Sequence, residues 1–393
     1  MYGVFLLIGI IGAPNKGKST LFSAITMNDV HIADYPFTTI DPNVGVAYVT
    51  AQCPHSEFGV SCNPRNSYCK NGTRYVPINV VDVAGLVEDA HSGKGMGNKF
   101  LNDLSTADGF ILVIDSSGKT DKNGNKCTGA DPAEDIALVK NELAEWLSGI
   151  IERHWKKVYM SEEPGAELAK MISGIGISGE VAEKCLRESG IRHRERDPPK
   201  EQMRHFAWKI IELSKPISIC ANKTDDPDSA KNTGKILAVS EGKCALCSAA
   251  IELALRKADK NGIIDYNPEK REFKELKEVD EAQKKALSYM RSFLKSGKSD
   301  VQGMLNRLAF EMLEMIVVYP VEDENKYADH YGNILPDAIL IKKGSTASDL
   351  AAIIHTDLAK GMLYAVDARS KRRIGKDYML KGGDVIRIVS AIR

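Results

Sequence analysis

The sequence has no excess of one charge and no apolar run long enough to span a membrane. Lysine and arginine total 53, as do aspartate and glutamate, so the overall charge indicates no particular class of partner. A spanning helix needs about 20 consecutive apolar residues, and the sequence contains no such stretch. The apolar run near the N-terminus also lacks the basic region and small-residue cleavage site of a signal peptide. We therefore expect a soluble, cytoplasmic protein without a membrane partner.

Cysteine is sparse, with eight in a chain of 393 residues. In a chain of this size, long enough for two or three domains, they are most simply reduced thiols. Potential metal ligands lie between residues 50 and 75, but their spacing differs from the close pairs that structural zinc sites favour. They are Cys53, His55, Cys62 and Cys69. The spacing favours a reduced, loop-rich hairpin and leaves metal binding as the alternative. The close pair Cys244 and Cys247 lies in an apolar strand, where core packing is the better interpretation.

One short stretch organises the rest of the chain. Residues 12–19 read G-A-P-N-K-G-K-S, the G-x-x-x-x-G-K-S pattern of a phosphate-binding loop. The apolar run over 4–11 predicts a buried strand before the loop, and residues 20–25 predict a helix after it. Strand, glycine-containing loop and helix are the context that this motif requires.

The chemistry of the loop follows from its residue types. Gly12 and Gly17 let consecutive backbone amides point into one concavity, to which the helix N-terminus adds positive potential. We expect Lys18 to reach the β- and γ-phosphates of a nucleotide and the Ser19 hydroxyl to bind Mg²⁺.

A second loop, over residues 34–40, reads D-Y-P-F-T-T-I. A threonine in such a loop can place its hydroxyl on Mg²⁺ and its amide on the γ-phosphate, so that the triphosphate orders the loop and hydrolysis releases it. We favour Thr39 over Thr38 as the metal ligand.

A third loop follows a predicted strand at 76–81 and reads D-V-A-G over 82–85. Asp82, at the tip of an apolar strand, is placed for a further contact to Mg²⁺, and Gly85 allows its amide to approach the γ-phosphate. The glycine-rich stretch 92–97 is expected to act as a second switch.

Leu86 stands where many GTPases carry a glutamine that orients the attacking water. Leucine cannot do this, so we expect slow intrinsic hydrolysis. A polar group would then come from a partner, from a bound cation or from His91, although an exposed histidine in a glycine loop is more often an ordinary surface residue.

The base-recognition element lies far downstream. A predicted strand at 217–221 ends in N-K-T-D over 222–225. The Asp225 carboxylate can accept hydrogen bonds from N1–H and the 2-amino group of guanine, which adenine does not offer. Asn222 is expected to brace the loop, and the stem of Lys223 to pack on the base.

After a strand at 244–247, the amides of Ser248-Ala249-Ala250 are placed to meet guanine O6. The residues expected to contact nucleotide come from all these loops and are Gly12, Asn15, Lys16, Gly17, Lys18, Ser19, Thr20, Phe37, Thr38, Thr39, Asp82, Gly85, Asn222, Lys223, Asp225, Ser248 and Ala249. Among them, Ser19, Thr39 and Asp82 are the predicted metal ligands, and Lys18, Thr39 and Gly85 the predicted catalytic residues.

These motifs together resemble the Obg-like GTPases, and most of all their archaeal and eukaryotic branch related to YchF. The specific features are P-N-K-G-K over 14–18, Y-P-F-T-T over 35–39, and A-G-L-V over 84–87 followed by G-N-K-F-L over 97–101. The resemblance covers nearly the whole chain and implies a P-loop GTPase of the α/β class.

The resemblance also carries alternatives. The best-known YchF proteins lack N-K-x-D and prefer ATP, whereas this sequence keeps Asn222 to Asp225, which implies GTP. Some related GTPases with an asparagine at the position of Asn15 use K⁺ in the transition state, so a K⁺ requirement is a hypothesis for this chain.

The region outside these loops is expected to form insertions and a second domain. We predict a GTPase domain over 1–317, with a cysteine-containing hairpin insertion at about 50–75 and a helical insertion at about 118–207. Within the latter, 136–155, 180–186 and 202–213 have helical patterns. A helical, charged stretch is predicted over 269–294 and an apolar helix over 301–315.

The last part, 318–393, is predicted to be a β-grasp module, with strands around a short helix near 347–355. Its K-G-S at 343–345 and L-K-G-G-D-V-I at 380–386 resemble a TGS domain, a module of translation-linked proteins. From 337 to 393 it carries eleven Lys/Arg against six Asp/Glu. The densest basic cluster comprises Arg369, Lys371, Arg372, Arg373 and Lys376.

A basic surface of this kind suits RNA phosphates, and a solvated loop is the alternative. We therefore expect a GTP-hydrolysing switch that is associated with the ribosome, through rRNA or tRNA. The alternatives are a protein-binding switch without RNA and an ATPase like the YchF relatives. A monomer is favoured.

Overall fold

The computed structural model describes residues 6–26, 44–83, 106–192 and 194–391. They form two compact units, which are described separately. Unit 1 comprises 1–6, 25–79 and 305–393, and unit 2 comprises 7–24 and 80–304. Both units therefore combine segments that are distant in sequence. The predicted boundary between 317 and 318 stays a prediction.

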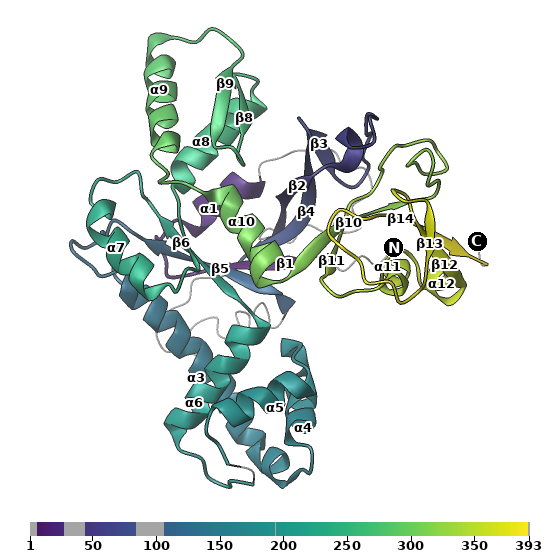
Figure 1. The fold of residues 1–393 in the computed structure, drawn as a ribbon. Helices are drawn as coiled ribbons and strands as arrows, with labels where there is room; N and C mark the ends of the chain where they lie inside the picture. Colours follow the sequence, from purple (N-terminus) through teal and green to yellow (C-terminus); the bar gives the residue numbers. More distant parts are fainter. Residues whose placement is uncertain (1–5, 27–43, 84–105, 193, 392–393) are drawn as a thin grey trace. The chain divides into compact units, whose positions relative to one another are not determined.

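Unit 2 contains a parallel sheet in which neighbouring strands run in the order β1, β5, β6 and β7 (Figure 1). Their bounds are Leu7–Ile11, Gly109–Asp115, Ile217–Asn222 and Cys244–Leu246. Every residue of β5 is buried, as expected of a parallel strand covered on both faces. The apolar runs of the sequence therefore predicted β1, β6 and β7 correctly, and the loops at the carboxyl ends of the four strands meet at one edge of the sheet.

Helices α1 (Lys18–Thr26), α7 (Ser229–Val239) and α8 (Ala249–Lys260) follow β1, β6 and β7 respectively. Ser248 caps α8 by accepting a hydrogen bond from the Ile251 amide, which satisfies one of the free donors of the first turn. Helix α1 begins at Lys18, so its first turn includes the last residues of the phosphate loop.

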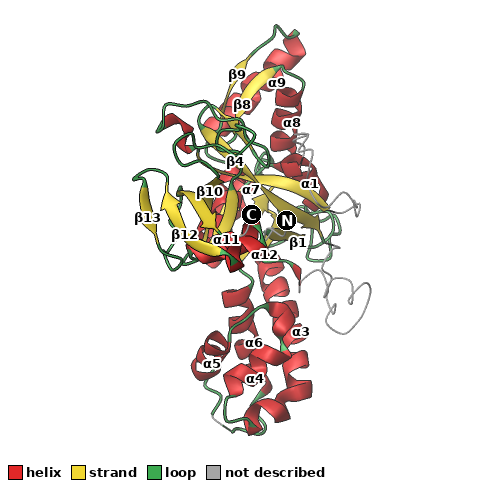
Figure 2. Cartoon of the chain, turned by 90° about the vertical axis from the view of Figure 1, so that its right-hand side faces the viewer, coloured by secondary structure: helices red, strands yellow, loops and turns green. Residues whose placement is uncertain are grey.

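The predicted helical insertion is present in unit 2. Its helices are α3 (Ala133–Met160), α4 (Pro164–Met171), α5 (Gly179–Glu188) and α6 (Lys200–Ser214). Figures 1 and 2 both show α3 and α6 side by side, with α4 and α5 against them. The apolar face of α3 is continuous with the core around β5.

All three tryptophans of the chain lie in this helical insertion. Trp146 and Trp155 are on α3, and Trp208 is on α6. The buried Trp155 donates a hydrogen bond to the Glu195 carbonyl over 3.0 Å and packs edge-on against Phe206. The indole thereby ties α3 to the loop before α6.

The prediction of one helix over 269–294 is wrong at its start. Strands β8 (Ile264–Asn267) and β9 (Glu272–Glu275) form a hairpin, and α9 (Glu281–Lys295) follows. Tyr266 and Phe273 pair across the hairpin and are buried. The many charged residues face solvent in either structure, so the helical pattern was ambiguous.

The helix predicted over 301–315 is also shorter than expected. Helix α10 (Val301–Asn306) continues as a wider π-helical segment, Arg307–Met312, and strand β10 (Met315–Val321) begins at once. The β-branched run at 316–318 is as well suited to a strand, which explains the difference.

The C-terminal part of unit 1 is a mixed sheet in the order β11-β10-β14-β12-β13. Strands β10 and β14 are parallel and the other neighbours antiparallel. Helix α11 packs on this sheet and short α12 follows it. The bounds are β11 Ile339–Lys342, α11 Ala347–Ile354, α12 Thr356–Lys360, β12 Met362–Asp367, β13 Arg372–Ile374 and β14 Val385–Ser390.

Strand β2 (Val44–Gln52) also lies in unit 1, together with most of β4 (Thr73–Asp82). Between them the chain forms the short helix η1 (Pro54–Ser56) and strand β3 (Tyr68–Lys70), which pairs with β4. We call residues 53–72 the hairpin insertion. It carries the four potential metal ligands of the sequence.

Candidate nucleotide-binding site

The phosphate loop has the backbone geometry that its glycines permit. Gly12 has φ +139° and Gly17 has φ +98°, conformations that favour glycine. A Cβ atom at Gly17 would lie 2.2 Å from the side-chain nitrogen of Asn222, and one at Gly12 would lie 2.5 Å from the Val113 carbonyl. Only glycine fits at either position.

The lysine and the serine of the loop bind different partners. The Lys18 ammonium donates a hydrogen bond to the Ala13 carbonyl of its own loop over 3.0 Å. Burial lowers the pKa of Lys18, while the charge of Asp82 opposes this shift. The Ser19 hydroxyl donates to Asp82 Oδ2 over 2.9 Å.

The Ser19–Asp82 pair fits a magnesium site. Among the described residues, Asp82 Oδ1 is buried and has no hydrogen-bond partner. A hydroxyl and a carboxylate are hard oxygen ligands of the kind that Mg²⁺ prefers. The structure therefore brings together Ser19 and Asp82, two of the three predicted ligands.

The Asn222 side chain binds two parts of the candidate site. Its side-chain amide donates to the Lys16 carbonyl over 2.9 Å, and its side-chain oxygen accepts from the Ala249 amide over 2.9 Å. The same side chain occupies the space that a Cβ atom at Gly17 would need, so Asn222 links the phosphate loop to the start of α8.

Asp115 was not among the predicted site residues, but the structure gives it a clear role. Its carboxylate lies 2.8 Å from the Lys223 ammonium, which also donates to the Asn15 carbonyl over 3.0 Å. Burial opposes the charged form of Asp115, yet hydrogen bonds from Lys223, Ser117 and Thr120 outweigh it and lower its pKa. The only sequence signal was its position at the end of an apolar strand.

Asp225, the predicted guanine ligand, is held by its neighbour across the site. Asp225 Oδ1 accepts a hydrogen bond from the Ser248 hydroxyl over 2.7 Å. The Ala249 amide is bound to Asn222 and the Ser248 amide donates to Ser299 over 3.4 Å. The expected contact of these amides to guanine O6 stays a prediction.

The side chains of Lys16 and Asn15 bind other segments of the chain. The Lys16 side chain is buried and forms an ion pair of 2.8 Å with Asp135. The predicted contact of Lys16 with nucleotide would therefore come from its backbone. The Asn15 side-chain nitrogen donates to the Gly124 carbonyl over 2.9 Å. Neither contact was visible in the sequence, because the partners lie more than a hundred residues away.

The remaining predictions are placed as follows. Thr20 lies in the first turns of α1. The two switch loops fall outside the described residues, and with them Phe37, Thr38, Thr39, Gly85, Leu86 and His91.

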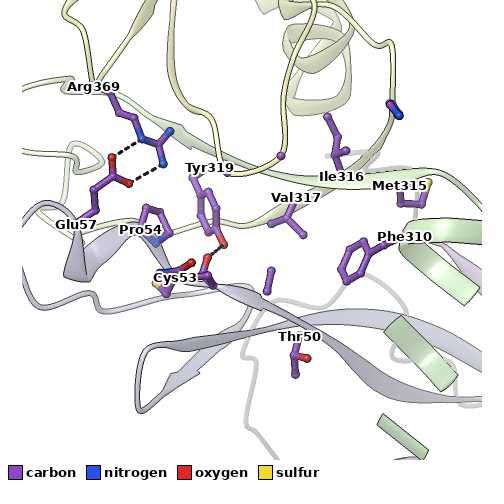
Figure 3. Close-up of a pocket in the computed structure, with 15 residues that line it drawn as sticks. Thr50, Cys53, Pro54, Glu57, Phe310, Met315, Ile316, Val317, Tyr319 and Arg369 are labelled. Atoms are coloured by element: carbon purple, nitrogen blue, oxygen red, sulfur yellow. Dashed lines mark hydrogen bonds and ion pairs between the residues drawn. The ribbon is translucent and has the colours of Figure 1, made fainter. Parts of the chain in front are cut away.

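A separate groove of about 800 Å³ lies within unit 1 (Figure 3). It is lined by residues of β2, η1, β10 and the C-terminal module, including Thr50, Cys53 and Tyr319. Figure 3 shows the Arg369 guanidinium facing both carboxylate oxygens of Glu57 at its rim, at 2.8 and 3.0 Å. None of the described nucleotide-loop residues lines this groove.

Comparison with known protein families supports a nucleotide-binding site at these loops. Residues 7–155 match the model of the 50S ribosome-binding GTPase family. Residues 220–323 match the G4 motif-containing domain of Obg-like, YGR210-like GTPases, and residues 331–390 match the TGS domain. The GTP-binding protein MJ1332 of Methanocaldococcus jannaschii is 46% identical over 396 residues, which cover 98% of this chain and 100% of the relative.

The chain belongs to the Obg-like GTPases of the YchF-related branch. A crystal structure of a GTP-binding protein from Pyrococcus horikoshii has a TM-score of 0.75 and 35% identity to this Obg-like GTPase, with 98% and 100% of the two chains covered. The ribosome-binding ATPase YchF of Bacillus subtilis is 27% identical over 408 residues, which cover 97% and 98%. The predicted fold, a P-loop GTPase fold with a helical insertion and a C-terminal TGS module, is confirmed.

In this Obg-like GTPase, no helix of the described segments is both long and apolar enough to cross a membrane.

Proposed function

We propose that the protein hydrolyses GTP to GDP and phosphate and acts as a molecular switch. The observation that supports this most strongly is the guanine loop. Asp225 is fixed by Ser248, while Asn222 and Lys223 of the same loop hold the phosphate loop. Base recognition and phosphate binding are therefore built on one connected set of hydrogen bonds.

The residues of the chain then have distinct tasks. Lys18 exchanges its bond to the Ala13 carbonyl for the β- and γ-phosphates, and Ser19 and Asp82 hold the metal. Bound Mg²⁺ neutralises charge that develops on the phosphates. Thr39 and Gly85 are proposed to sense the γ-phosphate. With Leu86 in place of a water-orienting glutamine, intrinsic turnover is slow unless K⁺ near Asn15 or a partner assists.

The choice between GTP and ATP rests on Asp225. In Asp225→Asn one carboxylate oxygen becomes an amide that donates, which mismatches the two donors of guanine. We expect GTP affinity to fall about 10- to 100-fold, since hydrogen bonds to charged groups contribute about 1.5–3 kcal/mol each. Titration calorimetry with GTP, GDP and ATP measures this.

Xanthosine nucleotides provide the matched control. Xanthine has an oxygen where guanine has the 2-amino group, so the amide of Asp225→Asn can donate to it. The variant should gain affinity for xanthosine triphosphate while losing it for GTP. Wild-type protein that prefers ATP, or a variant that loses all nucleotides equally, would contradict the proposal.

For the partner, we propose the ribosome or its RNA. The relatives named above include a ribosome-binding ATPase, and the C-terminal module has a basic cluster. Arg369 is paired with Glu57, and Lys371 contacts the Glu324 carbonyl and the Tyr327 ring. Arg373 is exposed but lies over the Tyr364 ring, whereas the exposed Arg372 and Lys376 remain available to phosphates.

Co-sedimentation with ribosomes in GDP, in a GTP analogue and without nucleotide tests this partner. Binding that depends on nucleotide and weakens with salt supports it. Absence of binding in every state would favour the alternative, a GTP-regulated switch that binds a protein without RNA.

A further inference from the structure

Four side chains of the hairpin insertion converge on one point. Cys53 follows β2, His55 lies in η1, Cys62 lies in the following loop and Cys69 lies in β3. Their sulfur and ring-nitrogen atoms all lie within 4.8 Å of one another. The sequence places them up to 16 residues apart, so the fold creates this cluster.

The separations match those of ligands around a tetrahedral metal. The Cys53 and Cys62 sulfurs are 3.8 Å apart. His55 Nδ1 lies 3.3 Å from the Cys62 sulfur and 3.6 Å from the Cys69 sulfur. In a tetrahedral zinc site, Zn–S bonds of about 2.3 Å and Zn–N bonds of about 2.0 Å place neighbouring ligand atoms about 3.5–3.8 Å apart.

We propose that Cys53, His55, Cys62 and Cys69 bind one zinc ion in a structural Cys₃His site. Four protein ligands fill the tetrahedral shell and leave no position for a substrate, which is typical of structural zinc sites. Cys53 is completely buried and the other three are half-buried, so the ion would be largely shielded from water.

A buried arginine supports the charge balance of this site. Zinc with three thiolates and a neutral imidazole carries a net charge of about −1. Arg74 is fully buried and lies directly opposite Cys69 in the β3–β4 pair, so both side chains are on the same face. The guanidinium donates to the neutral Ser67 hydroxyl and Leu335 carbonyl, but among the described residues no carboxylate forms an ion pair with it and its Nε has no hydrogen-bond partner. A buried cation needs a nearby negative charge, and the loaded cluster provides one.

A disulfide explains the arrangement less well. It requires two sulfurs at about 2.05 Å, whereas Cys53 and Cys62 are 3.8 Å apart. It would also leave unexplained why His55 lies beside both Cys62 and Cys69.

The proposed ion would fix a loop that contacts the C-terminal module within unit 1. Residues 56–61 and 63–68 separate His55, Cys62 and Cys69 in the sequence. Within them, Asn63 exchanges two hydrogen bonds with the backbone of Ile334, and Asn66 exchanges two with the backbone of Ala338. Arg65 forms an ion pair of 2.9 Å with Asp337. Metal binding would therefore stabilise this docking segment and leave the nucleotide loops unchanged.

Metal analysis of the full-length protein, purified without chelator, tests the proposal. We expect about one zinc ion per chain, and loss of most of it in Cys62→Ser. Cys127→Ser is the matched control, because Cys127 is a half-buried free thiol outside the cluster, and it should keep its zinc. Both variants should bind GTP as the wild type does, so that a failure here is distinct from a failure of the GTPase proposal.

Two measurements on the wild-type chain do not depend on the folding of a variant. Titration with a mercurial should release zinc as the cluster thiols react. Replacement of zinc by Co²⁺ should give the sulfur-to-metal charge-transfer band and strong visible bands of a tetrahedral thiolate site. Protein without stoichiometric metal, zinc retained in Cys62→Ser, or a Cys53–Cys62 disulfide found by mass spectrometry would each overturn the proposal.

Discussion

Asn222 links two segments of the candidate nucleotide site. It is 3% exposed and satisfies the Lys16 carbonyl and the Ala249 amide at once. Removing one side chain therefore leaves polar backbone groups of two separate loops unpaired. Removal of the Asn222 side chain should therefore lower nucleotide affinity more than removal of any single phosphate contact.

We predict that Asn222→Ala lowers the free energy of unfolding by about 1–3 kcal/mol, the cost of unsatisfied buried groups, and weakens GDP binding. Urea unfolding and calorimetry measure the two effects. Asn261→Ala, at the exposed end of α8, is the control. Equal stability and affinity in both variants would show that the brace is dispensable.

The lowered pKa of Asp115 predicts that the stability of the folded protein depends on pH. Its pKa is lowered in the folded protein, where hydrogen bonds from Lys223, Ser117 and Thr120 outweigh burial. The folded state thus holds the ionised form more strongly than the unfolded chain does. This stabilisation is complete above the ordinary value of 3.8 and is lost as the pH falls through the lower folded pKa.

Wild-type stability should consequently fall more steeply than that of Asp115→Asn as the pH is lowered below about 5. Urea unfolding at a series of pH values measures both curves. Asp197→Asn, at an exposed position, should follow the wild type. Parallel curves for wild type and Asp115→Asn would mean that the carboxylate adds nothing to stability.

Helices α4 and α5 of the insertion approach each other closely at a glycine. Gly165 in α4 lies so close to α5 that an added Cβ atom would be 2.5 Å from the Gly179 carbonyl and 2.8 Å from Glu183 Cβ. Gly149 in α3 has no atom within 4 Å of the same position. The close approach of α4 and α5 therefore requires a glycine at position 165, whereas no neighbouring atom requires one at position 149.

We predict that Gly165→Ala destabilises the protein by about 1–3 kcal/mol through overpacking. Gly149→Ala should instead stabilise it by about 0.5–1 kcal/mol, since alanine favours the helix. Thermal unfolding followed by circular dichroism compares them. A stabilised Gly165→Ala would refute the close contact of α4 and α5.

Local patterns predicted most elements correctly, but partners distant in sequence were beyond reach. Strand β1 was recognisable from its apolar run alone, because burial on both faces is a local pattern. The link of Asp115 to Lys223 depends on the register of β5 against β6, which places Asp115 opposite Asn222. Sequence spacing contains no information on that register.

The same reason explains the misread segments. In the hairpin of β8 and β9, exposed charged residues obscured the pairing of Tyr266 with Phe273. In the hairpin insertion, the irregular spacing of Cys53, His55, Cys62 and Cys69 gave no indication that their ligand atoms meet. Only the paired strands and the intervening loop bring them together.

For the chain as a whole, the basic cluster of the C-terminal module should determine how the proposed binding to ribosomes depends on salt. Each phosphate contact contributes about 0.9 to the slope of log affinity against log salt for duplex nucleic acid, and less for single strands. Arg372 and Lys376 are exposed, whereas Arg369 is already paired.

We predict that replacing Arg372 and Lys376 by glutamine lowers this slope by up to about two units and leaves GTP affinity unchanged. Ribosome co-sedimentation at several salt concentrations measures it. The same replacements at Lys270 and Lys274, exposed on the hairpin of β8 and β9, form the control. An unchanged slope would remove this cluster from the binding surface.

The placement of Trp146, Trp155 and Trp208 on α3 and α6 has a practical consequence for spectroscopy. Tryptophan fluorescence of the intact chain comes from the helical insertion alone, so unit 1 contributes nothing to this signal. A change of intensity or colour on adding a partner would therefore localise the perturbation to that insertion without any attached dye, whereas an event confined to the TGS module would leave the spectrum as it was.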